Sequence, residues 1–270
     1  MISKAKLKYI HALEQKKIRQ REQLFVAEGP KVVGDLLAHA KPRLVVGTKE
    51  WMQRNADSFA SGNCRTEEDG QVIRCGETEL LTVSEEELCR ASFLQHPQEV
   101  LAVFPLPEEG KADNVDLHQL VLALDGVQDP GNLGTIIRVA DWFGIKHIVC
   151  SRDTADAYNP KVVQATMGSI ARVRLHYTNL AEWTRALPKE VPVYGLLLDG
   201  DNIYKETLTE NGVIVMGNEG NGLSAEMRRL VTRRLFIPSF PPESETAESL
   251  NVAIATAVTC AEFRRRSLEK

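Results

Sequence analysis

The second half of the chain alternates short apolar runs with segments of helical periodicity, and this alternation limits the fold more than any other feature. Short strands separated by helices are typical of a mainly parallel sheet with helices on both faces. In such a sheet, ligands gather outside the carboxyl ends of the strands. Function is therefore expected in the loops that follow the strands. The predicted strands are residues 120–124, 147–150, 193–198, 213–216 and 235–237.

The first of these loops lies in the segment DGVQDPGNLGTIIRVADWFG, residues 125–144. Five residues between the strand and the helix tolerate unusual backbone angles and predict a turn: Asp129, Pro130, Gly131, Asn132 and Gly134. A glycine-rich turn that leads into a helix N-terminus suits a phosphate. Arg138 follows one turn into the helix, close enough to act with Asn132 on one ligand. The alternative is an ordinary strand-to-helix connection with a surface arginine.

The second loop is MGNEGNGLS, residues 216–224, which follows the apolar run VIVM. Its three glycines allow the backbone to approach a flat ligand closely. Glu219 either caps a turn or orients a neighbour such as Arg138. The sequence contains neither GxGxxG in register nor GK[ST], so a dinucleotide site and a P-loop are disfavoured.

The third segment is IPSFPPESETAESLNVAIATAVTCAEF, residues 237–263. Ser249 is most simply a helix cap and Asn251 a turn former. The helix that follows carries Leu250, Ile254, Ala257 and Val258 on one face. Its small residues permit close packing, either in the core or at a dimer interface; they are Ala253, Ala255, Ala257 and Ala261.

The first part of the chain predicts a small α/β domain. Residues 1–22 are basic and fit one amphipathic helix, whose charged face is either simply solvated or an RNA contact. A polar stretch with Pro and Gly predicts a linker. We therefore expect a first domain at residues 1–104, a linker at 105–116 and a second domain at 117–270. Within the first domain, strands are predicted at 43–46, 72–73 and 100–104, a strand, turn and helix at 24–37, and a capped helix at 84–90.

The composition is that of a soluble globular protein, with 43% hydrophobic and 26% charged residues. A net charge of -4 means that any RNA contact must come from local patches. No apolar run approaches the ~20 residues that span a bilayer, and the N-terminus is not a secretory signal. The five cysteines are scattered, which argues against a zinc site and a disulfide framework and favours a reducing, cytoplasmic location.

Three segments of the second half resemble the ordered motifs of the SpoU/TrmH family in the SPOUT superfamily. They are NLGTIIR at 132–138, the loop around Gly217, Glu219 and Gly222, and IP…ESLNVAIA at 237–255. The stretches KLKYIHAL and FVAEGPKVV resemble the family's substrate-binding domain. The resemblance therefore implies that residues 1–104 form an RNA substrate-binding domain and residues 117–270 a SPOUT methyltransferase domain. The family consists of S-adenosylmethionine-dependent RNA 2′-O-ribose methyltransferases. The resemblance implies a parallel-sheet domain with a deep trefoil knot, a homodimer, and no metal.

The resemblance also implies a site. The implied catalytic residues are Arg138, Asn132, Glu219, Ser249 and Asn251. The implied cofactor-binding residues are Leu196, Gly217, Ile237, Ser249 and Leu250. Arg138 would lie nearest the reacting hydroxyl, Asn132 would hold the RNA and position the arginine, and Glu219 would orient it. One departure is the nine-residue segment Ser239–Ala247, which contains no glycine and is longer than the family's usual spacing. It places the contacts of that segment in question.

The sequence thus predicts an RNA 2′-O-methyltransferase that acts on ribosomal RNA, because a separate N-terminal RNA-binding domain is more typical of the rRNA members. A tRNA methyltransferase is the nearest alternative. A catalytically silent RNA-binding protein is a second alternative. A nucleotide-dependent dehydrogenase is disfavoured, because this sequence lacks the glycine fingerprint of such enzymes.

Overall fold

The computed structural model describes residues 2–59, 64–66, 72–108, 112–241 and 247–268. The chain divides into two compact units. The first contains Met1–Glu108 and Tyr158–Ala171, and the second contains Glu109–Ala157 and Arg172–Lys270. The functional boundaries predicted at residues 104 and 117 stay a prediction.

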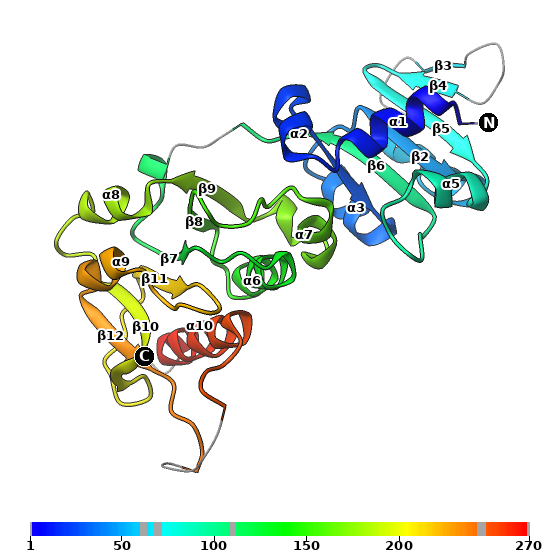
Figure 1. Ribbon diagram of the computed structural model, residues 1–270. Coiled ribbons are helices and arrows are strands. Elements are labelled where there is room, and N and C mark those ends of the chain that lie inside the picture. The colour runs from blue at the N-terminus through cyan, green and yellow to red at the C-terminus, as the bar shows by residue number, and fades with distance from the viewer. Residues whose placement is uncertain (1, 60–63, 67–71, 109–111, 242–246, 269–270) are drawn as a thin grey trace. The chain divides into compact units, whose positions relative to one another are not determined.

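The first unit is built on a mixed sheet with the strand order β1-β6-β2-β5-β4-β3 (Figure 1). The β2–β5 pair is parallel and the other neighbours are antiparallel. The strands include those predicted at 43–46, 72–73 and 100–104. They are β1 (Leu24–Glu28), β2 (Leu44–Thr48), β3 (Cys64–Thr66), β4 (Val72–Cys75), β5 (Thr78–Val83) and β6 (Val100–Pro105).

The basic N-terminal segment forms two helices, α1 (Lys4–Ala12) and α2 (Lys16–Glu22), where the sequence predicted one. Arg19 explains the break, because its buried guanidinium donates to the carbonyl oxygens of Leu13 (2.8 Å) and Glu14 (2.6 Å) just beyond α1. Ser84 caps α5 through a capping box, as predicted. The other helices of this unit are α3 (Pro30–Leu37), α4 (Lys49–Arg54), α5 (Glu85–Ala91), α7 (Pro160–Ala165) and the 3-10 turns η1 (Ala56–Phe59) and η3 (Ser169–Ala171).

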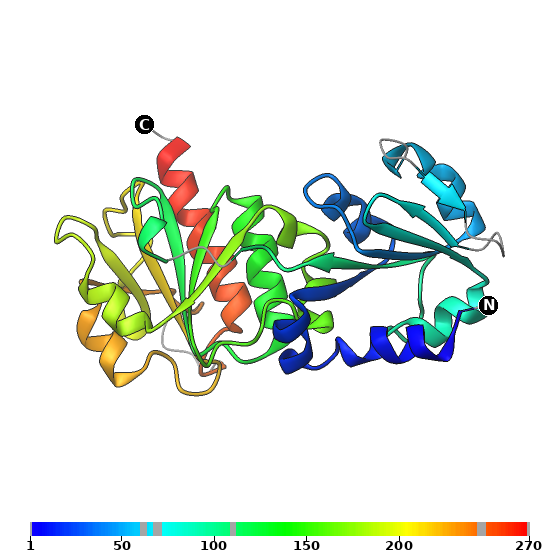
Figure 2. The ribbon, with the colours of Figure 1, turned by 90° about the horizontal axis from the view of Figure 1, so that it is seen from above.

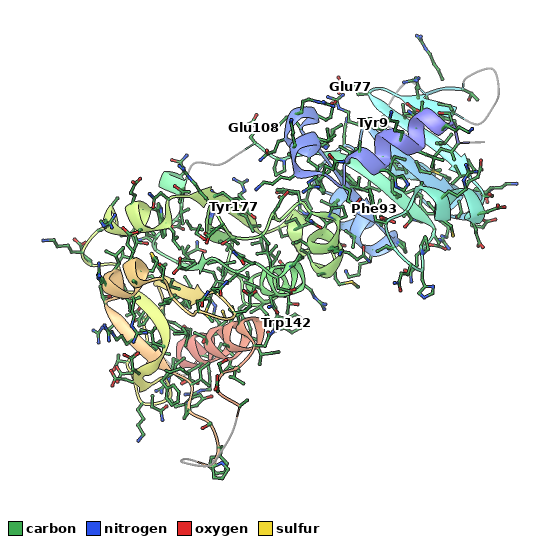
Figure 3. The ribbon with its side chains drawn as sticks, viewed as in Figure 1. Tyr9, Glu77, Phe93, Glu108, Trp142 and Tyr177 are labelled. Carbon is green, nitrogen blue, oxygen red and sulfur yellow. A yellow bond between two sulfur atoms is a disulfide. The ribbon has the colours of Figure 1, made fainter. Side chains whose placement is uncertain are left out.

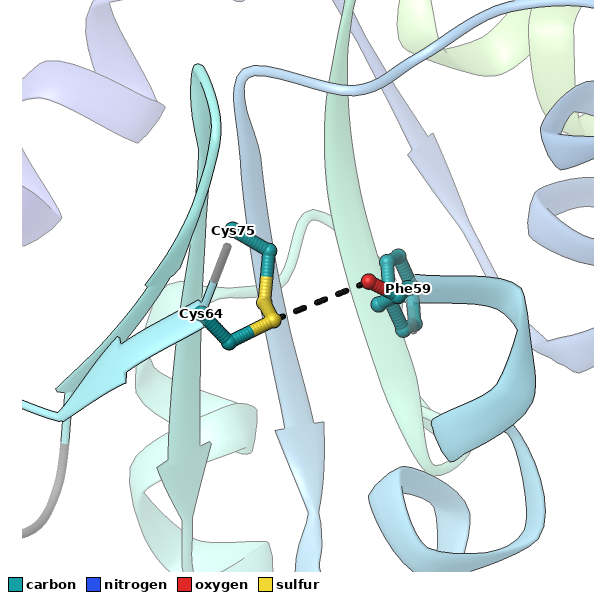
Figure 4. Close-up of a disulfide and its surroundings, with 3 residues drawn as sticks. All are labelled: Phe59, Cys64 and Cys75. Atoms are coloured by element: carbon teal, nitrogen blue, oxygen red, sulfur yellow. Dashed lines mark hydrogen bonds between the residues drawn. A yellow bond between two sulfur atoms is a disulfide. The ribbon is translucent and has the colours of Figure 1, made fainter. Parts of the chain in front are cut away.

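A disulfide joins Cys64 and Cys75, so the prediction that the cysteines form no disulfide was wrong for this pair (Figure 4). The two residues lie directly opposite each other in the antiparallel pair β3–β4, with 4.2 Å between their Cα atoms. Their spacing along the chain did not reveal this register, because pairing depends on which residues of two strands face each other. Cys89, Cys150 and Cys260 are free thiols.

The second unit is a sheet with the order β12-β10-β11-β7-β8-β9, in which every named strand pair is parallel. This confirms the predicted α/β fold class with a parallel sheet. The edge strand β9 was missed, because RLHYT is too polar to stand out as an apolar run. The strands are β7 (Leu120–Asp125), β8 (His147–Ser151), β9 (Arg174–Thr178), β10 (Val193–Asn202), β11 (Gly212–Gly217) and β12 (Arg233–Phe236).

Helices cover both faces of this sheet. On one face, α8 (Leu180–Arg185) and α9 (Ala225–Leu230) pack on the odd-numbered side chains of the central strands, among them Val121 and Val213. On the other face, α6 (Pro130–Trp142) and α10 (Val252–Leu268) lie side by side (Figures 1 and 2). The 3-10 turn η2 spans Ala112–Asn114.

Two further features bear on the sequence predictions. No helix in the described part of the chain is long and apolar enough to span a membrane. The implied knot depends on the path of residues 237–251, of which 242–246 lie outside the described residues, so the knot stays a prediction.

Candidate active site

The three predicted loops leave the same edge of the second sheet. Strands β12, β10, β11 and β7 are successive neighbours and run parallel, so their carboxyl ends lie together. Gly217 ends β11 and Asp125 ends β7, while Ile237 follows β12 directly. Leu196 lies within β10, before the irregularity in its pairing with β12.

Helix α6 begins earlier than the sequence suggested. Pro130 is its first residue, so Gly131 and Gly134, which were taken for a turn, lie in the first and second turns of the helix. The Asp129 side chain caps the helix and accepts the backbone N–H of Asn132 at 2.7 Å. The predicted phosphate site at this N-terminus is therefore already occupied in part by a carboxylate of the chain itself.

Glu219 supplies a second carboxylate to the same helix start. Its Oε1 accepts the Asn132 side-chain amide and the Asp129 backbone N–H, both at 3.1 Å. Its Oε2 accepts the backbone N–H of Gln128 at 3.3 Å. Glu219 thus joins the β11 loop to the loop before α6. Of the two roles predicted for Glu219, capping a turn is the one that these contacts fit.

Asn251 brings in the third segment. Its Nδ2 donates to Oδ1 of Asn132 at 2.9 Å. Its Oδ1 accepts the backbone N–H groups of Ala253 and Ile254 at 2.9 and 3.3 Å, so Asn251 holds the start of α10. The expectation that Ser249 is the cap of this helix was wrong. Ser249 is exposed, two residues before Asn251.

The β11 loop is folded around Asn218, a residue that the sequence reading passed over. Its Oδ1 accepts the backbone N–H groups of Gly220 and Asn221, each at 3.0 Å. A Cβ added at Gly217 would lie 2.3 Å from the carbonyl carbon of Gly222, so this close backbone approach requires glycine. The NEGNG pattern carries the signal that was missed, since an asparagine two residues before a glycine often accepts backbone N–H groups in a turn.

Arg138 stands apart from this network. It is exposed on α6, and no hydrogen bond or ion pair joins it to another of the described residues. The expectation that Glu219 orients Arg138 is therefore corrected: Glu219 holds Asn132 instead. Arg138 follows Asn132 by six positions in the helix, which places the two residues about 9 Å apart along the axis and about 120° apart around it. The guanidinium and the amide therefore leave the helix on different sides.

Exposed apolar side chains mark the segments expected to hold the cofactor. Leu198 follows Leu196 in β10 and is 70% exposed, and Leu250 is 51% exposed beside Asn251. Phe240, after β12, is 87% exposed. Large apolar side chains left in solvent at one edge of a sheet fit contact with the flat, apolar parts of a ligand. No group of three or more potential metal ligands occurs in the part of the chain that the structure describes.

The N-terminal unit presents cations as well. Lys4 and Lys8 are exposed on α1, and Lys16, Lys17 and Arg21 are exposed on α2. Arg19 is different, because its buried side chain holds the α1–α2 corner. The exposed residues, not Arg19, are the candidates for an RNA contact.

Comparisons with known proteins identify relatives of both parts of the chain. The SpoU rRNA methylase family model matches residues 119–261, and the MRM3-like substrate binding domain matches residues 4–102. The chain is 33% identical over 255 residues to the 23S rRNA (guanosine(2553)-2′-O)-methyltransferase RlmP of Bacillus subtilis, covering 94% of this chain and 93% of that protein.

Solved structures are similar over nearly the full length. A putative RNA methyltransferase of the TrmH family from Porphyromonas gingivalis has 39% identity and a TM-score of 0.82, with 98% of this chain and 99% of that chain covered. An AdoMet-bound rRNA methyltransferase from Sinorhizobium meliloti has 30% identity and a TM-score of 0.82, with 98% and 97% covered.

The hydrogen bonds around Glu219 set its ionisation. Burial would raise the pKa of the carboxyl, but the Asn132 amide and backbone N–H donors together outweigh it and lower the pKa below the ordinary value. A lowered folded-state pKa stabilises the fold above the ordinary glutamate pKa of about 4.3, and this stabilisation is lost as the pH falls through the folded-state pKa.

We expect the Glu219 carboxyl to titrate below the ordinary glutamate range in carbon-13 NMR. Asn132→Ala should raise its pKa, because the substitution removes a side-chain donor. Asn221→Ala is the matched control, since only the backbone of Asn221 bonds to this loop through Asn218. A midpoint at or above the ordinary value in the unsubstituted protein would contradict the hydrogen-bond network.

Proposed function

Because the chain belongs to the SpoU rRNA methylase family, we propose that it transfers a methyl group from S-adenosylmethionine to a ribose 2′-hydroxyl of ribosomal RNA. The observation that carries the proposal is the convergence of three distant segments on Asn132. Each segment contains one of the family's motifs, and they meet at the sheet edge where ligands bind in parallel α/β folds.

The cofactor would lie against the loops after β10, β11 and β12. We assign backbone groups of Leu196, Gly217 and Ile237 to its polar contacts, and Leu250 to its apolar ones. Ser249 would lie beside Leu250 and complete the lining of the site. S-adenosylmethionine supplies an electrophilic methyl group on a sulfonium, whose leaving group is a neutral thioether, so no metal is needed.

The residues of the chain then have to place the ribose and stabilise the charge on its oxygen. The Asn132 amide is held between Glu219 and Asn251, which fixes its direction. Arginine stays protonated in proteins, so Arg138 is better suited to stabilise the developing alkoxide and the adjacent phosphate than to act as a base. Its lack of a partner among the described side chains leaves it available for RNA.

We further propose that the protein is a homodimer formed through α6 and α10. The two helices run in the same direction, since Asn132 meets Asn251 near their starts and Arg264 donates to the Phe143 carbonyl near their ends. Trp142 is 85% exposed on α6 (Figure 3), and Ile254 is 51% exposed on α10. A second copy would cover this apolar surface and lie beside Arg138.

An RNA substrate requires a surface that binds phosphates, and it also bears on the cellular location. We assign the exposed cations of α1 and α2 to RNA phosphates, in keeping with the substrate-binding family matched by this region. A cytoplasmic location fits an enzyme of rRNA.

Purified protein should bind S-adenosylmethionine in titration calorimetry and transfer a labelled methyl group to rRNA. Mapping of 2′-O-methyl sites in cells with and without the protein would then identify the nucleotide. Transfer to tRNA alone would show that the substrate is tRNA and not rRNA. Heat of binding without transfer to either RNA would favour a silent RNA-binding protein, and no heat of binding would contradict the proposed binding of S-adenosylmethionine.

Arg138→Ala should keep the fold and the cofactor affinity but lower kcat by about 10²–10³-fold, because it removes a charge that acts on the developing alkoxide. Arg229→Ala, at an exposed arginine of α9, is the control and should retain activity. Single-turnover assays with saturating cofactor measure the effect. Turnover like that of the unsubstituted protein would remove Arg138 from the site.

Trp142→Glu and Ile254→Glu should each convert the dimer to a monomer, because they place a charge in an apolar interface. Light scattering after size-exclusion chromatography gives the mass directly. Leu198→Glu is the control, since this residue is also exposed and apolar but lies on β10. A monomer in the unsubstituted protein, or a dimer in both variants, would exclude this interface.

A further inference from the structure

The loop before α6 is fixed at one residue, Gly126, through both of its backbone polar groups. The Gly126 backbone N–H donates to Oγ of Ser151 at 2.8 Å, and the Gly126 carbonyl oxygen accepts Nδ2 of Asn218 at 2.7 Å. Gly126 has a φ of +74°, a conformation that favours glycine. Side chains from the ends of β8 and β11, the two neighbours of β7, therefore hold this residue from both sides.

Ser151 is itself held in place. Its Oγ lies 3.0 Å from Oγ1 of Thr154, and Thr154 donates to the Leu124 carbonyl oxygen at 3.1 Å. Both side chains are buried. The Ala155 backbone N–H also donates to the Val127 carbonyl oxygen at 2.9 Å. Residues of the loop after β8 thus hold the backbone from Leu124 to Val127 through hydrogen bonds.

The segment held in this way leads directly to the catalytic network. Gln128 and Asp129 follow Val127, and their backbone N–H groups bind the Glu219 carboxylate. Asp129 caps α6, and Asn132 lies in the first turn of that helix. A shift of the Gly126 backbone would move all of these groups together.

We propose that Ser151 is a positioning residue for methyl transfer, which acts through the Gly126 backbone on Asn132, and that Asn218 holds the other side of the same residue. The inference rests on the proposed role of Asn132. The described side-chain hydrogen bonds of Ser151 join it to Gly126 and Thr154, and none joins it to the β11 loop. Its loss should slow the chemical step and leave cofactor binding intact.

Ser151→Ala is the direct test. We expect kcat to fall by about 10–100-fold, since displacement of a positioned group by ~1 Å can cost 10²-fold, with an unchanged Kd for S-adenosylmethionine. Thr184→Val is the matched control, because Thr184 also has a buried hydroxyl with a backbone hydrogen bond, which it donates to the Leu180 carbonyl within α8. It should lower Tm without lowering kcat.

Asn218→Asp provides a second variant on the half-buried surface of the β11 loop, where folding is less at risk. The new carboxylate can still accept the N–H groups of Gly220 and Asn221, but it can donate neither to the Gly126 carbonyl nor to Oε2 of Glu219, which the amide meets at 3.5 Å. We expect kcat to fall again. The double variant should be less impaired than the product of the two effects, because both substitutions release Gly126.

The outcomes are distinguishable from a failure of the proposed site. If Asn132→Ala abolishes transfer while Ser151→Ala and Asn218→Asp keep the kcat of the unsubstituted protein, the positioning role is excluded and the site remains. If Ser151→Ala loses kcat and cofactor affinity together, in proportion to the Tm loss that Thr184→Val also shows, Ser151 is merely structural. An active Asn132→Ala variant would overturn both proposals.

Discussion

The carboxamide of Asn132 is the contact on which the assembly of the site depends. A carboxamide has a donor end and an acceptor end, and here each end meets a different segment of the chain. The donor end binds Glu219, 87 residues away, and the acceptor end binds Asn251, 119 residues away. Hydrogen bonds of this kind hold only if the partners are already close, because they contribute about 1 kcal/mol net apiece. The sheet must therefore bring the segments together first.

The strand order of the second unit does this. β7 and β11 are direct neighbours, so the loop before α6 and the Glu219 loop leave adjacent strand ends. α10 then lies along α6 on the same face, which brings Asn251 to the helix start. Because the pairing is parallel, all these loops meet at one edge, whereas an antiparallel arrangement would send alternate loops to opposite edges.

The sequence was sufficient to predict elements that depend on a local residue pattern. It was insufficient to predict which side chains contact each other in the folded chain. Continuous apolar runs such as VLAL and VIVM predicted central strands correctly, because both faces of such strands are buried. The start of α6 was misjudged because the glycines outweighed a stronger signal, Asp129 followed by proline at the first helical position. The partner of Glu219 and the pairing of Cys64 with Cys75 depend on strand register and three-dimensional neighbours, which no local pattern contains. The roles of the site residues in catalysis stay predictions.

The two carboxylates at the start of α6 also decide how RNA can approach. The positive end of a helix usually attracts an anion, but Asp129 already accepts the backbone N–H of Asn132, and Glu219 accepts those of Gln128 and Asp129. A phosphate placed at that point would meet negative charge. The cation available to a phosphate on this helix is Arg138, two turns further along. The helix start therefore fixes the geometry of Asn132, and in the proposed mechanism the exposed guanidinium would supply the charge that RNA and the reacting oxygen require.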